Sequence, residues 1–231
     1  MEELKIFFDQ FITKGGYKTA LSGLLVTAEI AIGGLIIGIL LGTVIAVIKV
    51  MPKYNKLPRV LDAICNIYVA IFRGTPMVVQ LLIGYFVLFP ALGIPIDGVI
   101  VAIAIFGLNS AAYVSEMMRS GIQSVDIGQL EAARALGMPY AMAMLKIVIP
   151  QSIKNILPTL GNEFIVLVKD TSVVSFIAVV DVTKAFKAIG DATYEYIVPY
   201  LFLALVYLVL VMGITLLVRL MERRLKKSER Q

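Results

Sequence analysis

Residues 128–150, GQLEAARALGMPYAMAMLKIVIP, end the polar stretch that separates two long apolar runs of the chain. Residues 130–136 are strong helix formers bounded by glycines, which predicts a short helix. On this helix Glu131 and Arg134 are spaced to pair at i, i+3. A second face would carry Leu130, Ala133, Leu136 and Gly137. A short helix of small residues suits docking into a groove of another protein, and the alternative is a helix that rests on lipid.

The composition on both sides of this stretch is that of a membrane protein. The 231 residues are 59% hydrophobic and 16% charged, with a mean hydropathy of +0.91. These values exclude a disordered chain, a disulfide scaffold and an ordinary soluble enzyme. The chain has one cysteine and no histidine, so a Ser-His-Asp or Cys-His arrangement and a Cys/His metal site are excluded. We therefore predict no catalytic residue, no metal site and no cofactor bound by this chain.

The apolar runs predict an all-α membrane protein with five transmembrane helices. The second run is interrupted at residues 73–76, and a shorter apolar piece, residues 173–180, is too short to cross and is predicted to be partial or re-entrant. Residues 4–12 have apolar positions near helical spacing and predict a short helix on the outer membrane surface. The five predicted spans are residues 20–50, 57–89, 97–118, 147–168 and 194–220.

The positive charges predict the orientation of these spans. With five spans, one side carries fourteen of the 21 Lys and Arg, including those of the basic tail at residues 219–231, and the other side carries six. The positive-inside rule then places the N-terminus outside and the C-terminus in the cytoplasm. A six-span count would put the basic tail on the wrong side. Contact with membrane lipid explains the charges, so no nucleic-acid partner is predicted.

The loop carries a motif of known spacing. Glu131-Ala132-Ala133, three residues, Gly137, nine residues and then Ile147-Val148-Ile149-Pro150 resemble the EAA loop of ABC importer membrane subunits, whose pattern is E-A-A-x3-G-x9-I-x-L-P. The one departure is Ile149 in place of leucine. Residues 72–80, 111–122 and 161–175 resemble the polar amino acid permease branch of the same family.

The resemblance implies one transmembrane permease domain over residues 1–231, with the type I ABC importer fold and a place in a prokaryotic inner membrane. The EAA loop, about residues 120–150, would couple the chain to a cytoplasmic ABC ATPase. The other implied partners are a second permease subunit, identical or homologous, and an extracytoplasmic amino-acid-binding protein. ATP would be used by the ATPase, because this chain has no G-x-x-x-x-G-K-[ST] motif. The coupling residues would be Glu131, Ala132, Ala133, Arg134 and Gly137.

Polar residues inside the spans predict the substrate path. Pro76 and Gly74 predict a break in the second span, which would expose backbone polar groups, although a simple packing kink is the alternative. Glu163 lies about 20 Å along a helix from Pro150, at about 1.5 Å per residue, and an ionisable residue at that depth indicates a functional site. Unless it pairs with Arg73, its carboxylate favours a cationic substrate group, so basic amino acids are the first expectation. The other path candidates are Asn162, Asn109, Thr75 and Gln80.

Three other classes of membrane protein are alternatives to the importer. A gradient-driven secondary transporter for amino acids would need an internal repeat, which the sequence lacks. A channel would need a filter motif, and a membrane enzyme would have to rely on Glu163, Asp170 and Asp181 without a histidine. The secondary transporter is the main alternative.

Overall fold

The computed structural model describes residues 2–93 and 97–227, with side chains as far as residue 225, and every element in these ranges is a helix. The last four residues of the predicted basic tail, 228–231, lie outside the described residues. In chain order the elements are α1 (Glu2–Phe8), η1 (Asp9–Thr13), α2 (Gly16–Val50), α3 (Lys56–Gly74), α4 (Met77–Ile83), η2 (Gly84–Leu88), α5 (Phe89–Ala91), α6 (Gly98–Gln123), α7 (Ile127–Ala135), α8 (Tyr140–Ala143), η3 (Met144–Val148), α9 (Ile149–Asp170), η4 (Thr171–Ile177), α10 (Val182–Thr193) and α11 (Ile197–Lys227).

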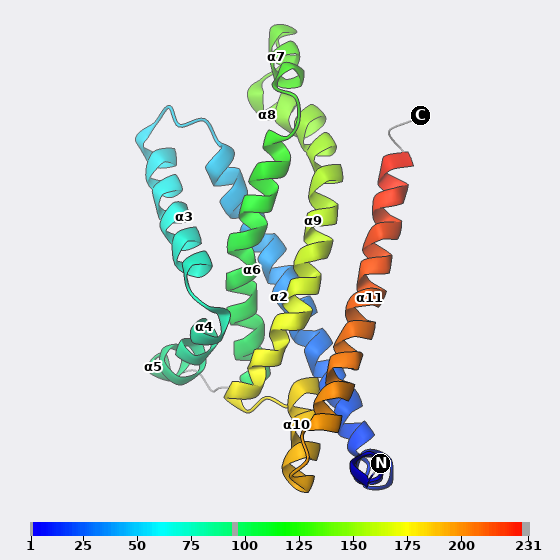
Figure 1. The fold of residues 1–231 in the computed structure, drawn as a ribbon. Helices are drawn as coiled ribbons and strands as arrows, with labels where there is room; N and C mark the ends of the chain where they lie inside the picture. Colours follow the sequence, from blue (N-terminus) through cyan, green and yellow to red (C-terminus); the bar gives the residue numbers. More distant parts are fainter. Residues whose placement is uncertain (1, 94–96, 228–231) are drawn as a thin grey trace.

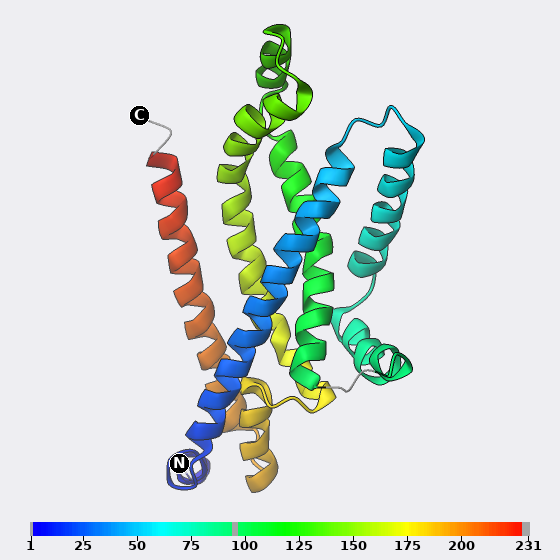
Figure 2. The same cartoon turned by 180° about the vertical axis from the view of Figure 1, so that it is seen from behind.

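The long helices α2, α6, α9 and α11 run along one axis, and the two ends of the chain lie at opposite ends of that axis (Figures 1 and 2). In the described ranges, α2, α6 and α11 are long and apolar enough to cross a membrane. The bent pair of α3 with α4–α5 makes a fourth crossing if it is counted as one span. The predicted all-α fold is confirmed. The count of five and the orientation stay predictions.

A fifth crossing would need α9, which lies beside α6 (Figure 1). This helix is less apolar than the others because it carries four charged residues, Lys154, Glu163, Lys169 and Asp170. Most of the short apolar piece after it lies in η4, a 3-10 helix of seven residues, and the chain then enters α10. This piece therefore does not cross, as the sequence predicted.

Glycines let α2 and α6 approach closely. A Cβ on Gly38 would lie 2.6 Å from the hydroxyl oxygen of Ser110, and a Cβ on Gly42 would lie 2.8 Å from a methyl group of Val114. Larger residues at these two positions would push α6 away. Gly34, Gly38 and Gly42 thus mark the face of α2 that packs on α6, as small residues do between membrane helices.

The second apolar run is broken where the sequence predicted. Helix α3 ends at Gly74, Thr75 and Pro76 are extended, and α4 starts at Met77. The two halves differ in direction by 106°, so α4 and α5 turn away across the end of α6 (Figure 1). The break is therefore a large change of direction and not a small kink.

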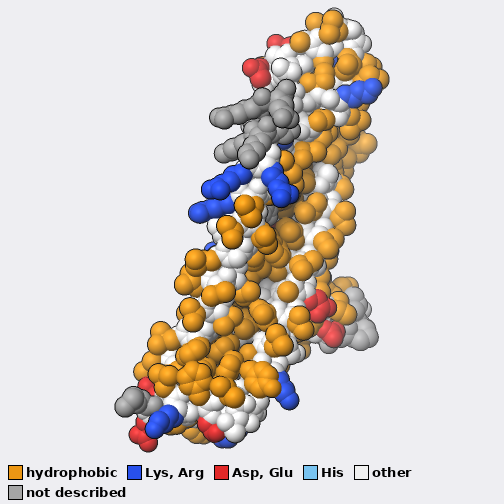
Figure 3. All heavy atoms as spheres, turned by 90° about the vertical axis from the view of Figure 1, so that its right-hand side faces the viewer, with side chains coloured by type: hydrophobic (Ala, Val, Ile, Leu, Met, Phe, Trp, Pro, Cys, Tyr) orange, Lys and Arg blue, Asp and Glu red, His pale blue; other side chains and the backbone are white. Residues whose placement is uncertain are grey.

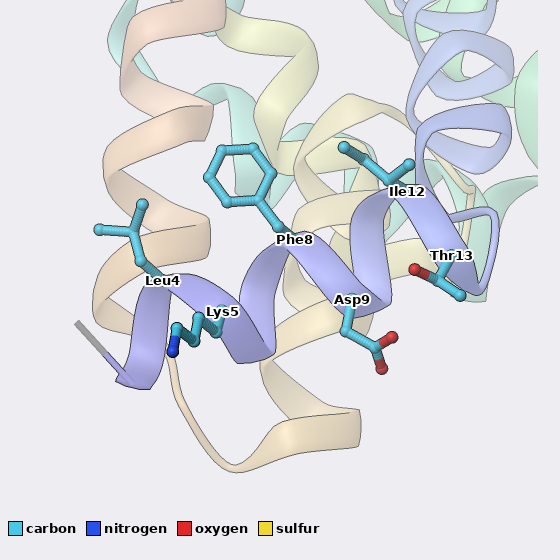
Figure 4. Close-up of a pocket in the computed structure, with 6 residues that line it drawn as sticks. All are labelled: Leu4, Lys5, Phe8, Asp9, Ile12 and Thr13. Atoms are coloured by element: carbon cyan, nitrogen blue, oxygen red, sulfur yellow. The ribbon is translucent and has the colours of Figure 1, made fainter.

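The N-terminal helix lies across the end of α2 (Figure 1). Its buried side stacks Phe7 on Phe202 of α11, with ring centroids 4.6 Å apart, and Phe11 on Phe186 of α10. On the other side it presents a shallow hollow in which Lys5 and Asp9 border the exposed apolar side chains of Leu4, Phe8 and Ile12 (Figure 4). The predicted N-terminal helix is thus present, and it has two apolar sides.

Helix α11 covers one flank of the molecule and is exposed along most of its length. Figure 3 shows this flank covered by hydrophobic side chains, with Lys and Arg gathered toward the C-terminal end. A continuous apolar surface bounded by basic residues is what a lipid-facing helix presents. The exposed apolar residues of α11 include Leu201, Leu205, Leu208, Val209, Met212, Leu216 and Leu217.

Candidate functional site

Four of the five predicted coupling residues lie on α7, and Gly137 follows it. Helix α7 is at the tip of the molecule, at the same end as the C-terminus (Figure 1). Asp126 caps α7, because its carboxylate accepts a 2.7 Å hydrogen bond from the N–H of Gly128. Gly137 has a φ of +82°, which allows the chain to turn sharply after the helix. The Arg134 guanidinium donates to the carbonyl of Met138 at 3.1 Å. The expected ion pair between Glu131 and Arg134 is not among the ion pairs of the described residues.

The coupling candidates do not share one exposed surface. Glu131, Ala132 and Arg134 are exposed, whereas Ala133 is only 3% exposed and faces the chain itself. Leu136, expected on the same face as Ala133, is 87% exposed. The expectation of a shared face is wrong because α7 ends at Ala135, so Leu136 is not in the helix.

A tyrosine joins this loop to the end of α2. The Tyr140 hydroxyl donates to the carbonyl of Val50 at 3.4 Å, which gives one of the last carbonyls of α2 a partner. Burial raises the pKa of Tyr140, and the nearby Tyr54 raises it further. A cavity of about 520 Å³ separates α7 from the ends of α2 and α6, and Leu130 and Met144 are among the residues that line it.

At the same end of the molecule, a cluster of three charged residues ties α2 to α6. Lys49 forms an ion pair with Glu116, and Arg119 binds the same carboxylate at 2.9 Å. The side chains of Lys49 and Glu116 are 10% and 20% exposed. Glu116 and Arg119 are three residues apart on α6, a spacing that brings their side chains together. The partner of Glu116 on α2 could not be read from the sequence.

Three of the path candidates meet at the break. The side-chain amide of Gln80 donates to the carbonyl of Phe72 at 2.8 Å and to the Thr75 hydroxyl at 2.8 Å. Its oxygen accepts a 2.9 Å hydrogen bond from the Asn109 amide. Asn109 also donates to the Phe72 carbonyl at 3.3 Å. The structure therefore brings Thr75, Gln80 and Asn109 together, with the amide of α6 joined to both sides of the bend.

Glu163 lies in the core, away from this network but beside the same helix. It is 5% exposed, and its Oε1 accepts a 2.9 Å hydrogen bond from the Ser110 hydroxyl. Arg73, the expected alternative partner, instead lies over the ring of Tyr113 at 5.2 Å from its centroid. In the described part of the chain the ion pairs do not include one between Arg73 and Glu163.

Asn162 is the path candidate that the structure keeps apart. It is exposed on α9, whereas its neighbour Glu163 is buried. Successive residues of an α-helix point about 100° apart, so the two side chains face different surroundings. Within residues 2–93 and 97–227, no three His, Cys, Asp or Glu side chains gather into a group that could hold a metal ion.

Sequence reasoning missed two residues of this region. Ser110 holds the buried carboxylate, and the only signal for it was its place beside Asn109 in an apolar span. Tyr68 donates to the carbonyl of Leu108 and so ties α3 to α6. A hydroxyl that bonds a main-chain carbonyl on another helix leaves no pattern in the sequence.

The chain matches the family model described as "Binding-protein-dependent transport system inner membrane component" over residues 34–227. The chain belongs to this family. The inner-membrane placement that the resemblance implied and the multi-pass character predicted from composition are therefore confirmed, and the resemblance carried by the EAA loop is correct. A gradient-driven secondary transporter, a channel and a membrane enzyme are set aside, because family members are permease subunits of binding-protein-dependent systems.

Relatives of this inner membrane component match it along nearly their whole length. It is 42% identical to the arginine transport system permease protein ArtQ of Bacillus subtilis (strain 168), over 90% of this chain and 93% of that protein. It is 39% identical to the putative glutamine transport system permease protein GlnP of Rickettsia bellii (strain RML369-C), over 88% of this chain and 91% of that protein.

Solved structures agree on the fold of this family member. It is similar to a chain of the crystal structure of an amino acid ABC transporter with histidines. The TM-score is 0.83 and the identity is 40%, over 90% of this chain and 94% of the other. It also aligns with a chain of the MetNI methionine ABC transporter in an inward-facing conformation. That alignment has a TM-score of 0.70 and 21% identity, covers 94% and 97% of the two chains, and speaks for the fold alone.

Proposed function

We propose that this permease carries polar amino acids, and basic ones in particular, through an ATP-driven ABC importer. The observation that carries the substrate class is the 42% identity over nine-tenths of the chain to an arginine transport permease. The buried Glu163 supports the basic preference, because the ion pairs among residues 2–93 and 97–225 give its carboxylate no cationic partner, and such a carboxylate inside a membrane attracts a cationic group.

Glu163 is the residue we assign to the substrate. In the described part of the chain its hydrogen-bond donor is the neutral hydroxyl of Ser110. A hydroxyl orients the carboxylate but leaves its negative charge uncompensated. The guanidinium of arginine or the ammonium of lysine would compensate it. Asn162, Asn109, Thr75 and Gln80 complete the proposed path, either beside the substrate or as supports of its walls.

The coupling and the orientation follow from the same proposal. The end with α7 and the C-terminus faces the cytoplasm, and the N-terminal helix and α10 face outward, with α9 as the fifth crossing. The chain binds no cofactor of its own, and a cytoplasmic ABC ATPase hydrolyses ATP. That ATPase docks on α7 through Glu131, Ala132, Arg134 and Leu136, while Ala133 and Gly137 shape the helix and its turn. A second permease subunit completes the path, and an extracytoplasmic amino-acid-binding protein delivers the substrate.

Uptake by proteoliposomes that contain the assembled importer tests the proposal. We expect ATP-dependent uptake of arginine that exceeds that of glutamine. We expect Glu163→Gln to reduce arginine uptake more than tenfold and glutamine uptake much less, with basal ATP hydrolysis retained. Glu29→Gln, at an exposed carboxylate of α2, is the matched control and should leave both uptakes unchanged.

Two results would contradict the proposal at different points. If the wild-type importer moves no amino acid, the substrate class is wrong. If Glu163→Gln lowers the uptake of arginine and glutamine equally, the carboxylate supports the fold and does not bind the cationic group.

A further inference from the structure

The end of α3 leaves backbone carbonyls without helical partners inside the membrane. Pro76 has no N–H, so the carbonyl of Phe72, four residues earlier, receives no bond from the position that would normally supply it. An unsatisfied carbonyl at this depth is costly because no water is at hand. At the neighbouring carbonyl, Ile71, the hydroxyl of Thr75 donates at 2.8 Å. Side chains thus supply hydrogen bonds where the helix ends.

At the Phe72 carbonyl, the missing donor is replaced from the far side of the bend. The side-chain amide of Gln80, in α4, donates to this carbonyl at 2.8 Å. The same nitrogen lies 3.0 Å from the Thr75 carbonyl and 2.8 Å from its hydroxyl. The Gln80 amide of α4 therefore bonds three acceptors on Phe72 and Thr75, where α3 ends.

The oxygen of the same amide is also occupied. It accepts from Asn109 of α6 at 2.9 Å, and Asn109 is buried and donates to the Phe72 carbonyl as well. A glutamine side chain has two N–H donors and one carbonyl oxygen. Both N–H groups face protein acceptors in this conformation, so a substrate could accept a hydrogen bond from Gln80 only by displacing one of these acceptors.

We infer that Gln80 is a positioning residue of the transport path, whose amide replaces the N–H missing at Pro76 and fixes the second half of the broken helix against α3 and α6. It acts on the substrate through the position of α4 and not by contact. This inference rests on the proposed transport function, and it narrows the role of one of the path candidates. Thr75 and Asn109 are the partners through which Gln80 acts.

The hydrogen bonds of Gln80, which we call the Gln80 clamp, also affect the transport step, because they reach α6 through Asn109. Asn109 bonds the broken helix, and the next residue, Ser110, bonds the proposed substrate carboxylate Glu163. A loosened α4 therefore removes a restraint from the helix segment that also holds Glu163. We expect such a loosening to slow the transport step while substrate affinity changes little.

A distance across the bend tests the clamp without any substrate. Spin labels at Ile67 of α3 and Val87 of η2, two exposed positions, would be placed in the assembled importer in a Cys65→Ala background. We expect one narrow distance distribution in the wild type and a clearly broadened one in Gln80→Ala. The matched control is Gln151→Ala, because the Gln151 amide bonds only its own helix among the described residues. An unchanged distribution in Gln80→Ala overturns the inference.

Uptake kinetics separate positioning from substrate contact. We expect Gln80→Ala to lower the maximal uptake rate at least tenfold and to change KM less than threefold. A tenfold rise in KM at an unchanged maximal rate would make Gln80 a ligand and overturn the inference.

If Gln80→Ala does not assemble, Thr75→Val removes one acceptor of the Gln80 amide and should broaden the same distance distribution, whereas Thr75→Ser keeps the hydroxyl and should behave as wild type. Equal behaviour of the two Thr75 variants overturns the inference too. A wild type that moves no amino acid contradicts only the proposed function, since the distance measurement stands alone.

Discussion

The charged cluster between α2 and α6 allows a quantitative test of what holds the α7 end together. Glu116 is the anion between Lys49 and Arg119, and Glu116→Gln leaves these two cations facing a neutral amide. Removing one partner of a buried ion pair costs about 3–5 kcal/mol. The three side chains are 10%, 20% and 34% exposed, so water screens part of this cost and we expect about 2–3 kcal/mol.

Removing Lys49 instead should cost less. In Lys49→Met the carboxylate keeps Arg119, so one ion pair with its hydrogen bonds survives, and we expect a loss of about 1 kcal/mol. In the double variant, Glu116→Gln with Lys49→Met, no buried ammonium group is left without an anion, and the remaining Arg119 is partly exposed. The loss in the double variant should therefore be smaller than the sum of the two single losses.

The single thiol of the chain offers the readout. Cys65 is buried in α3, so a dye that reacts with thiols reports unfolding of the permease in detergent, and Cys65→Ala supplies the background signal. For a chain of this length, about 2–4 °C of Tm corresponds to 1 kcal/mol. Glu116→Gln should thus lower Tm by about 4–12 °C. A fall below about 2 °C, or losses that add fully in the double variant, would refute the reasoning.

Three further predictions use other parts of the chain. Gly23→Ala should lower Tm in the thiol-dye assay, because its Cβ would lie 2.5 Å from the backbone oxygen of Asp181, just before α10, and such overpacking costs about 1–3 kcal/mol. Gly213→Ala, with open space around it, should raise Tm slightly in the same assay. Leu136→Asp should abolish co-purification of the ATPase, because Leu136 is the exposed apolar tip beside α7, whereas the equally exposed Tyr54→Ser on the α2–α3 turn should not. Hydrogen bonds from a lysine and a tyrosine lower the pKa of Asp191. The contribution of Asp191 to stability is therefore present above the ordinary carboxyl pKa and is lost as the pH falls through the lowered pKa. The fall of Tm between about pH 4 and pH 2 should be smaller in Asp191→Asn than in the wild type.

The break in the second span could be predicted because its cause is local. Gly74 and Pro76 are adjacent in the sequence to the bend that they produce, and Pro76 removes a hydrogen bond in any surroundings. The repair of the break could not be predicted. Whether Gln80 reaches back to Phe72 depends on the 106° bend and on where α6 places Asn109, and both are set by packing between distant segments.

The position of Glu163 far along a long helix was likewise within reach of the sequence, because the rise of a helix is fixed. Its partner was not. Ser110 meets Glu163 because α6 packs closely on α2, where Gly38 leaves room for the serine. The rotation of α6 about its own axis thus decides the contact, and no spacing within one helix contains that rotation.

The coupling helix shows how one boundary residue changes a predicted surface. Ala133 and Leu136 share a face only if the helix continues through both, and it ends between them at Ala135. Helix ends are uncertain by one or two residues even when the helix itself is certain. The consequence for the proposed docking is that the exposed apolar side chain is Leu136, while Ala133 packs inward.

Neighbouring residues of α6 connect the two polar features of the membrane interior. Asn109 bonds the broken helix on one side of α6, and Ser110 bonds Glu163 of α9 on another. Because consecutive helical residues point about 100° apart, a rotation or shift of α6 must strain both sets of hydrogen bonds at once. The end of the same helix that leads to α7 carries Glu116, which is tied to α2. A movement of α6 would therefore change three sets of contacts at once: those of the charged cluster, of the broken helix and of the buried carboxylate.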